Sequence, residues 1–129
     1  MANMSPCPPA EGPESPMAWL NGSAGWGDAV VIVPWELYRQ YGDERILAEM
    51  WPAMEAWIGR AARMARTRRN PARTVPAPHE EFLWDSGFHW GEWLVPGVEE
   101  HPSPDADHSD VATAYLAYSA GLMARIAVW

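Results

Sequence analysis

The sequence predicts an all-α protein built from helical hairpins. In three stretches, residues 28–41, 43–66 and 109–129, apolar residues recur mostly every three or four positions, as they do along one face of a helix. A short turn, Tyr41-Gly42-Asp43, separates the first two stretches. Two helices joined by so short a turn lie side by side and antiparallel, which is an α/α hairpin.

The first predicted helix begins at Asp28, a residue type favoured at the N-cap or in the first turn. The five consecutive apolar residues 29–33 would also suit a buried strand. Residues 35–41, however, have helical spacing, so we interpret the whole stretch as one buried helix that includes Pro34. Gly42 is the residue type that most often follows a helix at C′.

The second predicted helix is capped by Asp43 and carries a clear apolar stripe. Pro52 interrupts this stripe, because proline lacks the N–H that a helix interior needs. We therefore expect a short helix ending near Met50 and another helix with Pro52 in its first turn. The large apolar side chains of the stripe, Met50, Met54 and Trp57, are interpreted as core.

The remaining segments are less regular. Residues 1–24 are rich in Pro, Gly and Ser and are predicted to be irregular. Residues 67–106 are predicted to form a long loop, and so long a loop inside a domain is usually functional. The last helix should start at Ser109 or Asp110 and bury one stripe, formed by Val111, Ala114, Tyr115, Tyr118, Leu122 and Ile126. Because this helix meets the end of the chain without a cap, we expect residues 1–129 to be a fragment of a larger domain.

Composition sets further limits. A chain of 129 residues, 48% hydrophobic and 20% charged, is one globular domain at most. Its net charge of −8 argues against nucleic acid as a partner. No apolar run approaches the roughly 20 residues of a membrane span, and residues 1–16 do not resemble a signal peptide, so we expect no membrane partner and a cytoplasmic location. The single Cys7 cannot form an internal disulfide.

Tryptophan is the most informative residue type, with nine copies in 129 residues. Five of them lie beside an acid or a glycine in two segments, residues 25–35 (the first patch) and residues 83–93 (the second patch). An indole can cover the C–H face of a pyranose while a carboxylate accepts hydrogen bonds from its hydroxyls. The alternative is that these indoles simply fill a helical core. The two patches together favour a sugar site.

Several runs of this chain resemble the catalytic domain of bacterial α-L-rhamnosidases. They cover nearly the whole chain, and their combination is specific although each run alone is weak. The runs are Asn3-Met4-Ser5-Pro6, residues 20–29, Val33-Pro34-Trp35, Tyr41-Gly42-Asp43, Trp51-Pro52-Ala53-Met54 with Trp57, residues 83–94, and residues 110–115. The resemblance implies a partial α/α barrel of the six-hairpin type, and hydrolysis of terminal α-L-rhamnosyl groups with inversion.

The resemblance also implies a set of substrate-binding residues. Asp28 matches an acid that binds rhamnose hydroxyls, and Trp35 matches an aromatic residue lining the same pocket. Trp93 matches a tryptophan that packs against the sugar. Trp26 beside Asp28, and Glu92 where many relatives have Asp, complete the set. An aromatic wall suits the methyl group of a 6-deoxy sugar.

No catalytic residue is predicted within this chain. An inverting glycosidase needs a general acid and a general base roughly 6.5–9.5 Å apart. In the family these lie in motifs N-terminal and C-terminal to the region matched here, and the sequence contains neither motif. No cofactor or metal is predicted either, since the run that starts at His79 has Leu83 where the zinc motif needs its second histidine.

Three functions stay open at this point. The chain is part of an α-L-rhamnosidase, whose partners are a rhamnose-containing glycoside and the remainder of the catalytic domain. Alternatively it is a non-catalytic carbohydrate-binding module that uses the same tryptophans, or a helical interaction fragment whose aromatic surface is exposed barrel interior.

Overall fold

The computed structural model describes residues 22–71, 73–75, 78–91 and 107–128. Within these ranges the secondary structure is helical: α1 (Ala29–Tyr41), α2 (Arg45–Thr67), the short 3₁₀ helix η2 (Glu80–Phe82) and α3 (Ser109–Ile126). The predicted all-α class is therefore confirmed. The described part of the predicted loop 67–106 contains only η2 as regular structure.

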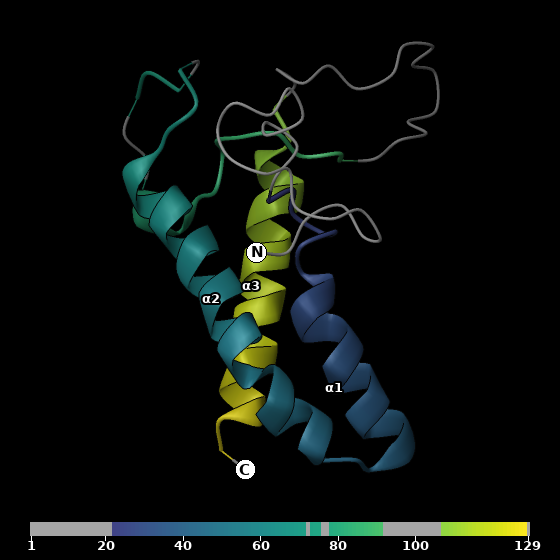
Figure 1. The fold of residues 1–129 in the computed structure, drawn as a ribbon. Coiled ribbons are helices and arrows are strands. Elements are labelled where there is room, and N and C mark those ends of the chain that lie inside the picture. Colours follow the sequence, from purple (N-terminus) through teal and green to yellow (C-terminus); the bar gives the residue numbers. More distant parts are fainter. Residues whose placement is uncertain (1–21, 72, 76–77, 92–106, 129) are drawn as a thin grey trace, which may run out of the picture.

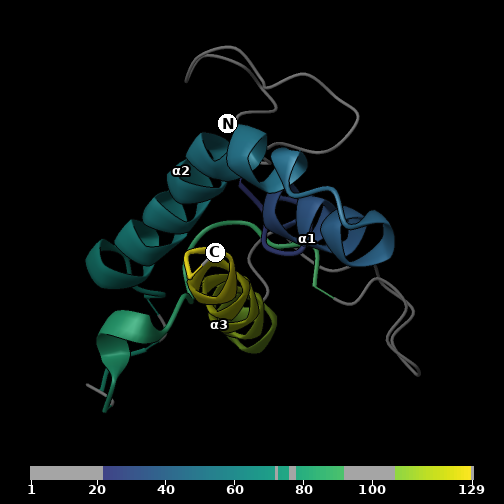
Figure 2. The ribbon, with the colours of Figure 1, turned by 90° about the horizontal axis from the view of Figure 1, so that it is seen from below.

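The three α-helices form a bundle in which each contacts the other two. Following the colours in Figure 1, α1 and α3 run in the same direction and α2 runs opposite to both. Figure 2, seen from below, shows the three helices at the corners of a triangle. The loops that precede α1 and α3 consequently meet at one end of the bundle, the upper end in Figure 1.

The turn between α1 and α2 agrees with the prediction. Gly42 adopts the left-handed conformation at φ 69° and donates its N–H to the Tyr38 carbonyl. The N-cap of α2 is Glu44, one residue after the predicted Asp43, whose carboxylate accepts the backbone N–H of Arg45 at 3.1 Å. Both Gly42 and Asp43 make their hydrogen bonds to residues that lie close by in the sequence, and the turn lies where the sequence predicted it.

The predicted break at Pro52 is wrong, because α2 runs without interruption from Arg45 to Thr67. Pro52 and Ala48, whose carbonyl loses its helical donor, both lie on the exposed side. Water can reach that carbonyl, while the opposite face is held in the core by Leu47 and Met54 on either side of the proline. Burial of the apolar face of α2 thus outweighs the loss of one backbone hydrogen bond at Pro52.

The predicted stripe of α3 is right for Leu122 and Ile126, which are buried, and for Tyr115, which packs against the core, but it is wrong for the other three positions. Val111 is only half-buried, Ala114 is exposed, and Tyr118 is 49% exposed. The face that α3 buries is instead Ala112, Leu116, Ser119, Leu122, Met123 and Ile126. Ala112 and Ser119 on this face are both 0% exposed, and Ser119 meets a buried acid, as described below.

The core confirms the interpretation of Met54 and Trp57, which are 0% and 3% exposed. Met50, partly buried, packs against the same cluster. Among the described helices, none is both long enough and apolar enough to cross a membrane.

Candidate functional site

The first patch is organised around the carboxylate of Asp28, which is 0% exposed. Oδ2 accepts the Gly25 N–H at 2.9 Å, and Oδ1 accepts both the Trp57 Nε1–H at 3.0 Å and the Ser119 hydroxyl at 2.5 Å. These donors come from the preceding loop, from α2 and from α3. One carboxylate therefore joins three parts of the fold at the start of α1.

Two glycines make this arrangement possible. Gly25 has φ 80°, a conformation that side chains disfavour, and this turn directs its N–H toward Asp28. Gly27 lies against the Trp57 indole so closely that a Cβ at this position would collide with the ring. The Gly-Trp-Gly-Asp run of the first patch is thus explained by close backbone packing against a buried tryptophan.

The second patch is anchored by Trp84, which is 1% exposed. Its Nε1–H donates to the Ser86 carbonyl at 3.0 Å, and its backbone N–H donates to the Thr113 hydroxyl of α3 at 3.0 Å. Its ring centroid lies 6.0 Å from that of Trp57 and 4.7 Å from that of His89, which it meets edge-on. The loop is therefore fixed on α2 and α3.

The two patches meet directly. The Ala24 N–H donates to His89 Nδ1 at 3.0 Å, and the Trp90 N–H donates to the Ser23 hydroxyl at 3.1 Å. These bonds join residues more than sixty positions apart in the sequence. They hold the segment before Asp28 against the Phe88–Trp90 segment, where Phe88 and Trp90 form an edge-on pair with centroids 4.8 Å apart.

His89 is neutral in this environment. Burial lowers its pKa to about 4, and this outweighs the opposing hydrogen bond to the Ser86 carbonyl. Since Nδ1 accepts from Ala24, the ring proton sits on Nε2, which faces that carbonyl at 3.3 Å. A neutral imidazole is required for this link, because a protonated Nδ1 could not accept.

The predicted substrate-binding residues have different surroundings. Trp26 is 46% exposed at the loop surface, next to the buried Asp28. Trp35 is partly buried against the core, with its ring centroid 5.7 Å from that of Tyr38. Glu92 and Trp93 lie outside the described residues, so their approach to Asp28 stays a prediction. The Asp28 carboxylate offers no exposed oxygen in this conformation.

Ser119 and His89 are structural partners that sequence reasoning missed, and Trp57 was interpreted only as core. A signal for Trp57 existed, because a buried indole N–H needs an acceptor and Asp28 was available. For Ser119 and His89 the pairing joins distant segments, and nothing local indicates it.

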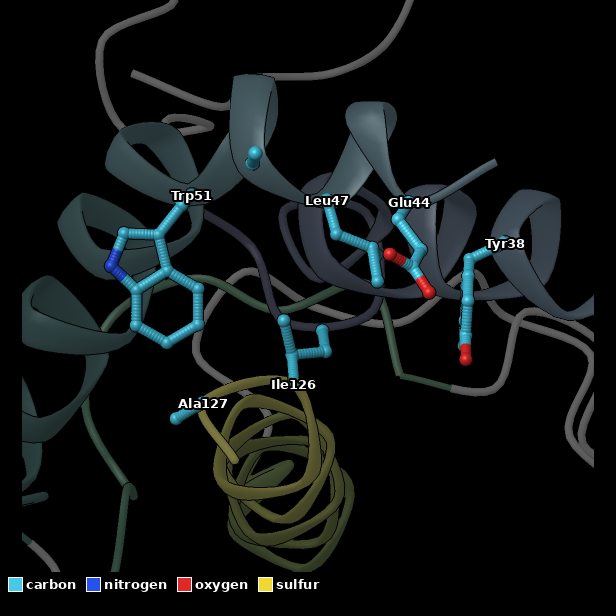
Figure 3. A pocket seen from close by; sticks show the side chains of 7 residues that line it. Tyr38, Glu44, Leu47, Trp51, Ile126 and Ala127 are labelled. Carbon is cyan, nitrogen blue, oxygen red and sulfur yellow. The ribbon is translucent and has the colours of Figure 1, made fainter. Parts of the chain in front are cut away.

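The described surface has several cavities, and three of them are lined by residues other than Asp28, Trp26 and Trp35. One of about 400 Å³ lies at the opposite end of the bundle from the two patches, between Leu47, Trp51 and Ile126 (Figure 3). Its lining is largely apolar, with Glu44 and the Tyr38 hydroxyl as its polar groups. Within the described ranges, no group of three or more potential metal ligands occurs.

The α1–α2 hairpin, with α3 packed against it, belongs to a helical-hairpin glycosidase domain, as comparison with known families shows. The family model of the bacterial alpha-L-rhamnosidase 6 hairpin glycosidase domain matches residues 1–129. The chain belongs to this family.

Relatives agree with this assignment. An alpha-L-rhamnosidase of Streptomyces avermitilis is 37% identical over 107 residues, covering 83% of this chain and 8% of the relative. One from Alteromonas sp. (strain LOR) is 33% identical over 115 residues, covering 85% and 11% respectively. The chain thus spans about a tenth of the length of these relatives.

A solved structure shows the same arrangement of helices. The crystal structure of the Streptomyces avermitilis alpha-L-rhamnosidase complexed with L-rhamnose matches with a TM-score of 0.58 and 36% identity, covering 84% of this chain and 9% of that one. The predicted α/α hairpin architecture and the family resemblance are therefore confirmed.

Proposed function

We propose that this chain is part of an α-L-rhamnosidase that hydrolyses terminal α-L-rhamnosyl residues, and that it contributes to the rhamnose pocket. The observation that carries the proposal is the pair of hydrogen bonds, Ala24 to His89 and Trp90 to Ser23, that bring the two patches together. These bonds hold the segment before Trp26 and Asp28 against the segment that leads to Glu92 and Trp93 in the sequence. The L-rhamnose named for the related structure supports the choice of sugar.

In this proposal the indoles provide the apolar contacts. Trp26 presents an exposed face at the loop surface, and Trp35 follows two turns into α1. Trp93 and Glu92 would complete the pocket from the second patch. A 6-deoxy sugar has a methyl group and a C–H face for such surfaces, while its hydroxyls need polar partners.

In this proposal Asp28 fixes the conformation of the loop that precedes α1. Its carboxylate already accepts from Gly25, Trp57 and Ser119, which occupy both oxygens. A direct bond from Asp28 to a sugar hydroxyl would require one of these donors to move away. The Ser119 hydroxyl can rotate most easily, because the other donors are a backbone N–H and an indole fixed by packing.

We propose that the general acid and general base come from outside this chain. Of the buried carboxylates in the described part of the patches, Asp28 accepts from three donors and Asp85 is paired through Oδ2 with the guanidinium of Arg73 at 2.6 Å. Sugar binding alone does not lower a hydrolytic barrier.

The test is a titration of the chain with L-rhamnose, followed by tryptophan fluorescence. We expect a saturable change in the parent chain that is lost in Trp35→Ala and kept in Trp51→Ala. The second variant removes an indole of the distant apolar cavity and serves as the matched control. No change up to tens of millimolar would exclude the sugar contact and favour an interaction fragment.

A turnover assay on an aryl α-L-rhamnoside completes this test. We expect no release above background from the chain alone, since the acid and base lie elsewhere in this account. Turnover that survives purification and disappears with a substitution in this chain would contradict their absence.

A further inference from the structure

The cavity at the α1–α2 turn is separate from the residues proposed for rhamnose. Its volume is about 400 Å³, within the range of roughly 300–1,000 Å³ usual for small-molecule sites. All three α-helices line it, with Tyr38 from α1, Leu47 and Trp51 from α2, and Ile126 from α3. Figure 3 shows Trp51 and Tyr38 on opposite sides of the cavity, with Leu47 and Ile126 between them. The cavity is therefore formed by the packing of the bundle.

One charged side chain lines this cavity, the carboxylate of Glu44 at the start of α2. Glu44 is exposed, so a ligand can reach its oxygens. Its carboxylate caps no backbone N–H, and the guanidinium of the neighbouring Arg45 is bound to Asp43 at 2.8 Å. Within the described part of the chain, the Glu44 carboxylate has no ion-pair partner, and none of the described lining residues is basic. The cavity thus carries a negative charge that no neighbour compensates.

Two aromatic rings add surfaces that attract cations. The Tyr38 ring is seen edge-on in Figure 3, with one face toward Glu44 and Leu47, and the Trp51 indole forms the opposite side. The face of an aromatic ring is electron-rich and attracts a cation that lies over it, with Trp the strongest and Tyr next. Leu47 and Ile126 offer apolar surface to alkyl groups. A cation with an apolar body would use both kinds of surface.

The lining limits the chemistry of the occupant. An anion would be repelled by Glu44. A bare Ca²⁺ ion takes roughly six to eight oxygen ligands, whereas this lining has one carboxylate. A sugar has several hydroxyls, and the only polar side chains here are Glu44 and Tyr38. An organic cation needs one counter-charge and otherwise apolar contacts. We propose that this cavity binds an organic cation of the alkylammonium class, with its ammonium group beside Glu44.

The experiment is an NMR titration of the whole chain with choline chloride as the probe. The indole N–H signal of Trp51, assigned by its loss in Trp51→Phe, reports this cavity, and that of Trp26 reports the opposite end of the bundle. We expect a saturable shift of the Trp51 signal, with a dissociation constant on the order of a few millimolar, and no shift of the Trp26 signal.

Two control ligands separate charge from the other contributions. The neutral alcohol 3,3-dimethylbutan-1-ol has the shape of choline without its charge, and it should bind more weakly by roughly threefold or more. Sodium chloride at the same concentration reproduces the ionic strength and should not shift the Trp51 signal. L-rhamnose should also leave the Trp51 signal in place, so this site and the proposed rhamnose pocket can fail independently.

Matched variants locate the binding. Glu44→Gln removes the charge from the lining, and Glu49→Gln removes a charge from an exposed position of α2 outside it. We expect the first to weaken choline binding by roughly threefold or more and the second to leave it unchanged. Ala48→Leu fills the cavity from α2 and should abolish the Trp51 shift. Ala53→Leu makes the same change at an exposed position of α2 outside the lining and should preserve it.

Three results would overturn the proposal. The first is a Trp51 signal that does not move at tens of millimolar choline. The second is a neutral alcohol that binds as tightly as choline, since the charge would then contribute nothing. The third is choline binding in Glu44→Gln and Ala48→Leu that is as tight as in the parent chain, since the shift would then arise elsewhere. Circular dichroism of each variant establishes that it is folded.

Discussion

Asp28 shows how a single buried side chain can organise the whole end of a bundle. Its three donors belong to the loop before α1, to α2 and to α3, so the loss of any one affects how these parts meet. A buried charge without its hydrogen bonds is costly, and this explains why a serine, a tryptophan and a glycine converge on it.

Ser119→Ala should reveal this role. The substitution removes a hydrogen bond to a buried carboxylate and should lower the free energy of unfolding by about 1.5–3 kcal/mol. Chemical denaturation of the two chains measures the difference. Thr67→Ala, which removes a hydroxyl from an exposed helix end, should change it by less than about 0.5 kcal/mol. Equal effects of the two substitutions would contradict the role given to Asp28.

His89 should make the junction of the two patches sensitive to acid. Its pKa falls from 6.5 to about 4 on folding, so between these values the unfolded state binds more protons than the folded state. Stability is therefore fully present above pH 6.5 and decreases as the pH falls toward 4. At pH 5 the loss from this group should be about 2 kcal/mol.

Chemical unfolding at pH 7 and at pH 5 measures this loss of stability, and His89→Gln serves as the comparison. The variant lacks the titrating ring and should lose less stability between the two pH values. If the variant and the parent chain lose the same amount, His89 is not the source of the pH dependence.

At the scale of the elements, α2 shows which sequence signals dominate. Pro52 lacks a hydrogen-bonding N–H, yet the helix continues because the buried stripe on the other face spans the proline. Pro52→Ala should restore the bond to the Ala48 carbonyl and raise the free energy of unfolding by about 1–3 kcal/mol. A loss of stability in thermal or urea unfolding would show that the proline is required by its surroundings.

Features set by neighbours in the chain could be predicted, and features set by distant partners could not. Gly42 and Asp43 define a turn by their own conformation and hydrogen bonding, so the hairpin was readable in the sequence. The buried face of α3 includes Ser119, which bonds to Asp28 91 positions away, so the spacing of apolar residues predicted only part of this face, namely Leu122 and Ile126.

The candidate site also combines features that could be predicted from neighbouring residues with features that depend on distant partners. The two patches were recognisable because indoles, glycines and acids cluster locally in each. Their junction rests on His89 and Ser23, which bond across more than sixty positions and have no local signature. The burial of Asp28 was equally hidden, because its donors come from three separate segments.

At the scale of the whole molecule, α1 carries apolar side chains on its exposed side as well as its buried one. Val33, Leu37 and Tyr41 are 52%, 39% and 76% exposed and follow one another at helical spacing. A row of large apolar side chains on the exposed face of a helix is normally covered by other elements. We therefore expect the isolated chain to associate as its concentration rises.

Sedimentation at several concentrations tests this expectation. The mean mass should rise with concentration, and Leu37→Glu should reduce the rise more than Glu36→Gln, which changes a polar neighbour on the same helix. A sample that stays monomeric at every concentration would contradict it.

The most direct test of the central claim is an NMR measurement of contacts between L-rhamnose and the chain. If the two patches form one rhamnose pocket, nuclear Overhauser effects should connect the sugar methyl group with indole protons of both Trp35 and Trp93. Contacts to only one of these rings, or to the distant Trp51 instead, would contradict a pocket built from both patches.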